Sequence, residues 1–146
     1  MRSDIRTLVE QVLGKGYLMS LATVDEGGVW VADVIYVFDD DFNVYWMSKP
    51  YRRHSLALEK NQKIAGTITV SGPREYNLGI QFQGKGEKIE GKRRDLAIKH
   101  LSKRGKPIPG EEDDVLLGSF WYKLKPTSIE LIHEELFGFD KQKLIL

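Results

Sequence analysis

The first third of the chain consists of strand-like segments joined by very short turns, and this pattern limits the folds open to it. Residues 17–24, 29–38 and 42–47 are rich in β-branched and aromatic side chains, which favour strands. Their connections are a turn with two glycines at 25–28 and three aspartates at 39–41. Such short connections join antiparallel neighbours, whereas parallel strands need a long crossover. The sequence therefore predicts a three-stranded antiparallel meander.

Three further strands and three helices are predicted in the chain. The strands are expected at residues 64–70, 76–89 and 120–132, and the helices at residues 5–13, 50–60 and 92–103. Ser3 stands where a helix N-cap is expected, and Pro50 is suited to the first position of its helix. Six strands with only three helices predict a mainly β fold with flanking helices, whose sheet curls into a small closed or partly closed barrel.

Glycines and a proline interrupt two of these strands. Gly79, Gly84 and Gly86 lie inside one strand, where glycine often marks a bulge, a barrel corner or the close approach of another group. Pro126 lies inside the last strand and predicts that one strand edge there is free. The chain has no internal repeat and no linker, so residues 1–146 are expected to form one domain.

The composition excludes several kinds of chemistry. The chain has no cysteine, so disulfides, thiolate nucleophiles, iron–sulfur clusters and cysteine zinc sites are ruled out. A formal net charge of +1 gives no overall attraction to nucleic acid or anionic membranes. The N-terminal residues lack the apolar run of a signal peptide, and no segment approaches the roughly 18 apolar residues of a membrane span. We therefore expect a cytoplasmic protein with no membrane partner.

The turn between the third strand and the following helix carries the strongest functional signal. Lys49, Arg52, Arg53 and His54 crowd the predicted start of the helix. Cations are unfavourable there, because the helix dipole and the free N–H groups already make this end positive. An anion would relieve the conflict, and Ser48 adds a hydroxyl that can bind it. We interpret the turn as a phosphate-binding site, with a solvated basic turn as the alternative.

Other polar residues give weaker signals. Asp33 lies in an apolar strand, where a carboxylate needs a partner unless strand alternation places it on a wet face. His54, His100 and His133 lack the spacing of metal ligands, so no metal site is expected. Residues 92–106 hold seven Lys or Arg and one acid, and we interpret them as a solvated helix face rather than a nucleic-acid-binding patch.

Several short segments together resemble a known family. They are Leu21-Ala22-Thr23, Val34-Ile35-Tyr36-Val37-Phe38, Met47-Ser48-Lys49 followed by Arg53-His54, Gly79-Ile80-Gln81-Phe82-Gln83-Gly84, Lys125-Pro126 and Leu136-Phe137-Gly138-Phe139. Their order resembles that of the FMN-binding split barrels related to pyridoxamine 5′-phosphate oxidase, over nearly the whole chain. Within that superfamily the chain is similar to a small group of bacterial and archaeal proteins of unassigned function.

The resemblance implies a fold, a cofactor and a set of binding residues. The fold would be a six-stranded split β-barrel with Greek-key connections, which forms a homodimer with FMN at the dimer interface. His54 stands where the family often has Lys, which is a stronger cation near neutral pH. The implied FMN-binding residues are Ser48, Lys49, Arg53 and His54 for the phosphate, Asp33, Val34 and Ile35 along the flavin ring, and Gln81 from a later strand.

The resemblance also implies a flavin-dependent oxidoreductase of unknown substrate, in which FMN carries the hydride or electron transfer. The tail Gly138-Phe139-Asp140-Lys141 lacks the Arg-x-His that binds substrate in pyridoxamine 5′-phosphate oxidases, so that reaction itself is not expected. No residue stands out as a catalytic acid or base. Two rival interpretations stay open: a non-catalytic module that binds flavin or haem, and a cofactor-free structural or nucleic-acid-binding dimer.

Overall fold

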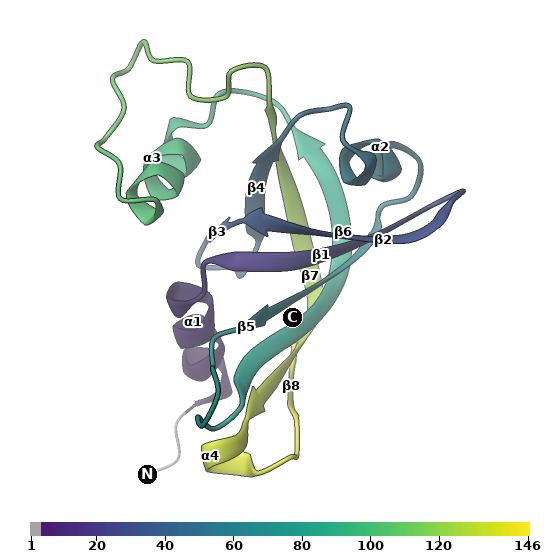
Figure 1. Ribbon diagram of the computed structural model, residues 1–146, viewed down its shortest axis with the longest axis vertical. Helices are drawn as coiled ribbons and strands as arrows, with labels where there is room; N and C mark the ends of the chain where they lie inside the picture. The colour runs from purple at the N-terminus through teal and green to yellow at the C-terminus, as the bar shows by residue number, and fades with distance from the viewer. Residues whose placement is uncertain (1–3) are drawn as a thin grey trace.

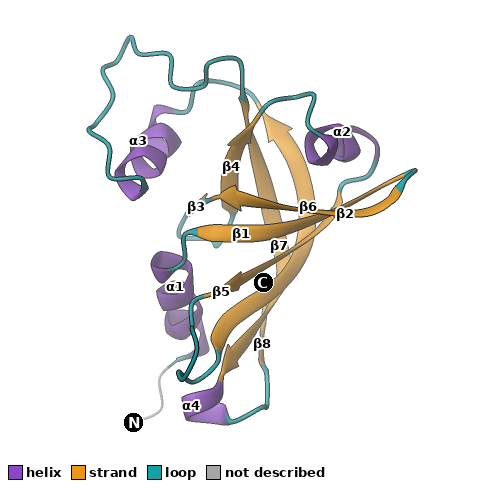
Figure 2. Ribbon diagram, in the orientation of Figure 1, coloured by secondary structure: helices purple, strands orange, loops and turns teal. Residues whose placement is uncertain are grey.

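A curled antiparallel sheet, flanked by helices, dominates the computed structural model, which describes residues 4–146 (Figures 1 and 2). The strands are β1 (Leu18–Asp25), β2 (Gly28–Ile35), β3 (Val37–Phe38), β4 (Val44–Ser48), β5 (Lys63–Thr69), β6 (Leu78–Ile89), β7 (Phe120–His133) and β8 (Gln142–Ile145). The helices are α1 (Ile5–Lys15), α2 (Arg53–Lys60), α3 (Arg94–Lys103) and α4 (Glu134–Phe137). The predicted N-cap Ser3 lies outside the described residues.

The order of the strands explains why the sheet curls. It runs β2-β1-β5-β6-β7-β4-β3, with β8 paired to β7, and every pair is antiparallel. β2 and β3 stand at opposite ends of this order, yet only Tyr36 separates them in the chain. The sheet must therefore bend until its ends approach each other, which gives the open barrel of Figure 1. The predicted mainly β barrel with flanking helices is confirmed.

The sheet has eight strands rather than the predicted six. Tyr36 divides the predicted strand 29–38 in two, because its side chain is fully buried and its hydroxyl donates a hydrogen bond to the Leu13 carbonyl at 2.6 Å. On either side of Tyr36 the chain changes partner, since β2 pairs with β1 and β3 with β4. The other additional strand, β8, was missed because polar and apolar residues do not alternate in its sequence, Gln-Lys-Leu-Ile.

β6 and β7 confirm the prediction that glycine and proline mark irregular points in the sheet. Gly84 lies opposite Pro126, next to a shift in register. A Cβ atom on Gly84 would lie 2.0 Å from the carbonyl oxygen of Lys125, so no larger residue fits without moving the backbone. On its other edge, β7 pairs with β4 as far as Leu124 and with β8 from Ser128. Pro126 therefore occupies the gap between them, where the missing N–H breaks no ladder.

Two groups of buried side chains hold the helices in place. α1 packs on the sheet through residues at helical spacing, as predicted: Leu8, Val9, Val12 and Leu13. A second, smaller group joins α3 to the strands through Val37, Tyr45, Leu96, Ala97 and Trp121. The second group holds α3 beside the end of β4, while α2 lies on the other side of β4 in the view of Figure 1. These two helices frame the candidate site.

Candidate functional site

The connection between β4 and α2 forms a turn followed by an uncapped helix. The Arg52 N–H donates to the Lys49 carbonyl at 3.2 Å, and Pro50 takes the second position of this turn, where proline is favoured. α2 therefore begins at Arg53, three residues later than predicted. No side chain caps the helix, and its first turn contains no acidic residue. The positive end of α2 thus has no anionic partner within its own first turn.

A cavity of about 540 Å³ opens beside this turn. It is lined by six of the eight predicted cofactor-binding residues, namely Asp33, Val34, Ile35, Ser48, Lys49 and His54. The other lining residues are Leu18, Met47, Arg52, His100, Arg104 and Ser119. We refer to Ser48, Lys49, Arg52 and His54 as the β4–α2 wall, and to His100, Arg104 and Ser119 as the α3 wall.

Ser48 and His54 form a hydrogen-bonded pair in the β4–α2 wall. The Ser48 Oγ atom lies 2.9 Å from Nε2 of His54, whose side chain is almost fully buried. Burial, and to a lesser extent the neighbouring Arg52 charge, lower the pKa of His54 below its ordinary value. His54 is therefore a neutral hydrogen-bonding group at neutral pH, not a standing cation. A bound anion would oppose both effects and raise that pKa.

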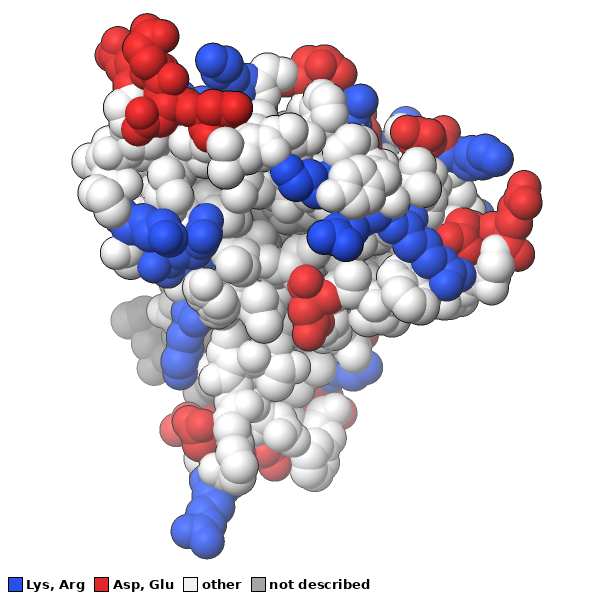
Figure 3. All heavy atoms as spheres, turned by 45° about the horizontal axis from the view of Figure 1, so that its top comes forward, with Lys and Arg blue, Asp and Glu red and all other residues white. Residues whose placement is uncertain are grey.

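The cations of the β4–α2 wall are not neutralised by carboxylates. The Lys49 ammonium donates to the backbone carbonyl of Leu117, and the Arg52 guanidinium lies 5.5 Å from the centre of the Tyr51 ring. Among the described residues, neither Lys49 nor Arg52 takes part in an ion pair. Figure 3 shows Lys and Arg side chains on both sides of a hollowed region of this face, with one acidic side chain at the hollow and the other acidic side chains toward the periphery. The arrangement favours an anionic ligand.

The α3 wall was not anticipated, because residues 92–106 were interpreted as a solvated face. His100 is 3% exposed and packs edge-on against Trp121, with 5.8 Å between the ring centres. Its Nδ1 atom is buried and has no hydrogen-bond partner among the described residues. Leu96 and His100 are spaced by four and so share one face of α3, and Arg104, the C-cap residue, follows at the same spacing. The buried Leu96 was the available signal that this face turns inward.

Arg53 lies outside the cavity, although it was a predicted phosphate ligand. Its guanidinium makes two hydrogen bonds to the Asp25 carboxylate, at 2.8 and 3.0 Å, and lies 4.4 Å from the centre of the Trp30 ring. The pair lowers the pKa of Asp25 and raises that of Arg53. The β1–β2 hairpin thus holds Arg53, and Arg52 takes its place in the cavity wall.

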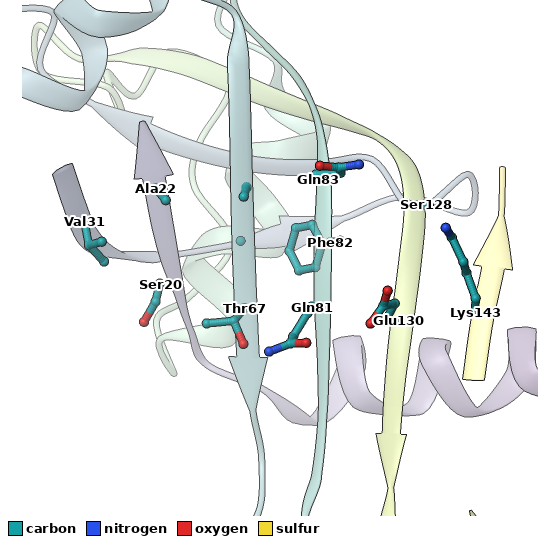
Figure 4. Close-up of a pocket in the computed structure, with 12 residues that line it drawn as sticks. Ser20, Ala22, Val31, Thr67, Gln81, Phe82, Gln83, Ser128, Glu130 and Lys143 are labelled. Carbon is teal, nitrogen blue, oxygen red and sulfur yellow. The ribbon is translucent and has the colours of Figure 1, made fainter. Parts of the chain in front are cut away.

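Gln81 also lies elsewhere, on the face of the sheet. It lines a second cavity of about 470 Å³ together with Ser20, Val31, Thr67 and residues of β7 and β8 (Figure 4). Its side-chain oxygen accepts a hydrogen bond from the Lys141 ammonium at 2.8 Å. Within one chain, Gln81 and the β4–α2 wall therefore belong to different cavities. We refer to the second one as the sheet-face cavity.

Asp33 connects the two regions. It lines the first cavity, and it accepts a hydrogen bond at 2.6 Å from Ser20, which lines the sheet-face cavity. The sequence left open whether Asp33 has a polar partner or lies on a solvent-exposed face; in the structure its carboxylate has both the Ser20 partner and exposure to solvent.

Among the described residues, no group of three or more His, Asp or Glu side chains could hold a metal ion. No helix in this part of the chain is both long and apolar enough to span a membrane.

Comparison with known sequences identifies relatives in enterobacteria. A YhbP protein of Escherichia fergusonii, described as a UPF0306 protein, is 30% identical over 101 residues, which cover 67% of this chain and 68% of the relative. The chain belongs to the UPF0306 family. The UPF0306 protein YhbP of Escherichia coli O157:H7 matches at 27% identity over 143 residues, or 96% of this chain and 92% of the relative. No protein-family model matches the chain.

Solved structures share the fold of this UPF0306 protein at low sequence identity. The conserved hypothetical protein Rv2991 of Mycobacterium tuberculosis has a TM-score of 0.79 at 12% identity, over 99% of this chain and 92% of that one. A Listeria innocua protein provisionally assigned as a pyridoxamine 5′-phosphate oxidase has a TM-score of 0.71 at 14% identity, over 88% of this chain and 98% of that one. The haem storage protein HutZ of Vibrio cholerae has a TM-score of 0.63 at 13% identity, over 98% of this chain and 95% of that one. The fold is the split barrel expected from the sequence.

Proposed function

We propose that this UPF0306 protein binds FMN in the cavity beside the β4–α2 turn and acts as a flavin-dependent oxidoreductase. The observation that carries the proposal is the convergence of unpaired cations and an uncapped helix start on one cavity. Lys49 and Arg52 have no carboxylate partner among the described residues, and no side chain caps α2. A phosphate at this wall would meet both needs at once.

The residues present fit the different parts of FMN. The β4–α2 wall supplies the Ser48 hydroxyl and two cations for the phosphate, while Val34 and Ile35 offer strand backbone and apolar side chains for the flavin ring. A volume of about 540 Å³ lies within the usual range of small-molecule sites, which is roughly 300–1,000 Å³. Bound FMN would supply hydride or electron transfer. The chain itself holds the phosphate, orients the ring along β2 and leaves the α3 wall facing the same cavity.

The visible absorption spectrum of the purified protein, before and after addition of FMN, tests the proposal. We expect FMN to bind with a perturbed flavin spectrum, and riboflavin, which lacks the phosphate, to bind much more weakly. Equal affinity for FMN and riboflavin would contradict phosphate recognition by the β4–α2 wall. Turnover of reduced nicotinamide by the loaded protein would then distinguish an oxidoreductase from a flavin-storing module.

A pair of adjacent variants locates the phosphate. Arg52→Gln removes a charge from the cavity wall, and we expect FMN affinity to fall about tenfold to a hundredfold, since a charged hydrogen bond contributes about 1.5–3 kcal/mol. Arg53→Gln is the matched control, because its guanidinium is bound to Asp25 outside the cavity. It should retain FMN affinity within about threefold. A larger loss of FMN affinity for Arg53→Gln would mean that Arg53 binds the phosphate, as inferred from the sequence alone.

Haem binding is a second candidate function, favoured by the two buried histidines of the cavity. Burial lowers the pKa of both His54 and His100, so both rings are neutral at neutral pH, the form that binds iron. Addition of haem to the protein should then give a sharp Soret band that His100→Leu or His54→Leu abolishes. Retention of FMN without such a band would favour the flavin assignment.

A further inference from the structure

We propose that the α3 wall is a second binding site within the cavity, which takes the carboxylate of a small organic substrate. The inference rests on the proposed flavin site, because it assigns the phosphate to the β4–α2 wall and leaves the α3 wall for another ligand. Three groups form the site: the His100 ring, the Arg104 guanidinium and the Ser119 hydroxyl. None of them belongs to the residues predicted to hold FMN.

The His100 ring is the main evidence for a ligand. Its side chain is 97% buried, since only 3% is exposed, and it forms part of the cavity wall. Nδ1 has no hydrogen-bond partner, and no hydrogen bond to the other ring nitrogen is present among the described residues. Buried polar groups are nearly always satisfied, so a buried Nδ1 without a partner, on a ring that borders a cavity, indicates a missing partner for the imidazole. A hydrogen-bonding ligand would supply it.

Arg104 determines the charge of that ligand. It is the C-cap residue of α3, four residues after His100, and it has no ion pair among the described residues. The neighbouring Lys103 does not add to the site, because its ammonium donates to the Tyr36 carbonyl at 2.6 Å and covers the Tyr36 ring. One permanent charge with neutral donors beside it matches a singly charged carboxylate, which an arginine binds in a bidentate manner.

The position of Ser119 brings the two walls into one cavity. β4 pairs with β7 so that Ser48 lies opposite Phe120, the residue that follows Ser119. A ligand on the α3 wall would therefore lie beside a flavin whose phosphate is held at Ser48. Because the apolar residues Leu18 and Met47 also line the cavity, the rest of the substrate is expected to be apolar or aromatic.

Benzoate is a suitable probe, with benzyl alcohol as the uncharged control. We expect benzoate to shift the absorption spectrum of the FMN-loaded protein in a saturable manner, and benzyl alcohol to bind much more weakly. Arg104→Gln should weaken benzoate binding about tenfold or more, while leaving FMN affinity within about twofold of the wild type. Lys106→Gln is the matched control, because it removes the same charge two residues later from an exposed side chain that lines neither wall.

A readout without flavin separates failure of this inference from failure of the flavin proposal. The chain has three histidines, so His100 can be assigned in the nitrogen spectrum of histidine-labelled protein by comparison with His100→Gln. Benzoate should move the His100 ring signals in the wild type and not in Arg104→Gln, with or without FMN. Unmoved His100 signals, or equal benzoate affinity in Arg104→Gln and Lys106→Gln, would overturn the α3 site. A loss of FMN affinity in Arg104→Gln as large as that in Arg52→Gln would also overturn it, because Arg104 would then hold the cofactor.

Discussion

His100 is a buried histidine in a strongly basic helix, and its surroundings affect stability as well as binding. Burial, followed by the charges of Arg104 and Lys103, lowers the pKa of His100 to about 4. From other elements, the ring faces Trp121 of β7, and Asp33, Lys49, Arg52 and His54 line the cavity that it borders. The folded protein therefore holds this imidazole in its neutral form well below the ordinary histidine pKa.

The stability of the protein should fall in mild acid because of His100. Above about pH 6.5 the ring is neutral in both the folded and unfolded states and has no effect on pH dependence. Below it, the unfolded chain binds a proton that the folded chain does not, so stability falls until the pH reaches the folded pKa. At pH 5 the loss from His100 should be about 2 kcal/mol. Urea unfolding of the wild type and of His100→Leu at pH 7 and pH 5 measures this loss of unfolding free energy. An equal loss between the two pH values in both proteins would contradict a buried, neutral His100.

Arg52 and Arg53 show how far residue-level prediction from the sequence could go. The sequence grouped a basic turn with Ser48 and His54, and the structure places these residues beside one cavity, because they are close in the chain. It could not decide which arginine faces the cavity, since that depends on Asp25, which lies 28 residues before Arg53 and captures it. His100 was missed for a related reason: its burial depends on docking of α3 against the strands, and residues 92–106 around it are rich in Lys and Arg.

At the scale of elements, the β6–β7 pair contains the most restrictive backbone contact. A Cβ on Gly84 would meet the carbonyl oxygen of Lys125, a backbone atom that cannot turn away. Gly84→Ala should therefore destabilise the protein by at least about 2 kcal/mol, as overpacking does in dense interiors. Gly14→Ala is the matched control, because a Cβ at Gly14 meets no atom within 4 Å and the residue lies inside α1.

The two alanine variants should change stability in opposite directions. Alanine in a helix is favoured over glycine by about 0.5–1 kcal/mol, so Gly14→Ala should stabilise the protein slightly. Urea unfolding midpoints compared at equal m-values give both differences. Similar midpoints for Gly84→Ala and the wild type would mean that the β6–β7 register can shift to admit a side chain.

Strand signals predicted most elements but not the path of the sheet. Alternation and β-branched residues located β1, β4, β5, β6 and β7 to within a few residues. The break at Tyr36 was not visible, because its cause is a hydrogen bond to the Leu13 carbonyl in α1. Such a contact closes only after the helix packs on the sheet. β8 depends in the same way on pairing with β7, because its own four residues carry no strand pattern.

At the scale of the whole molecule, one face of the sheet carries apolar residues that a second copy could cover. Val29 and Val31 are 70% and 58% exposed, and they alternate with Trp30, which points to the other face and contacts Arg53. Val31 also lines the sheet-face cavity of Figure 4, and Asp33 continues the same face into the candidate flavin site. Residues 42–47 do not add to this surface, because they are largely core, with Trp46 fully buried.

We propose that two copies of this chain associate through this face, since contiguous exposed apolar residues usually mark an interface. The dimer would bring a second chain to the edge of the cavity at Asp33, which agrees with the implied position of FMN at the interface. Sedimentation equilibrium at micromolar concentrations should give about twice the chain mass of 16.7 kDa. A mass near 16.7 kDa throughout would contradict the dimer.

The interface can be located with one substitution and a control. Val31→Asp would place an unpaired carboxylate in the contact, which is costly to bury, so we expect the dimer to weaken at least tenfold and the mass to fall toward one chain at low concentration. Ile108→Asp makes a similar change at a residue that is 72% exposed on the loop after α3, and it should leave the mass unchanged. FMN affinity should fall with Val31→Asp in proportion to the loss of dimer, because the site at Asp33 would lose its second chain. Dissociation of the dimer by Ile108→Asp and not by Val31→Asp would place the interface at the α3 end of the molecule instead.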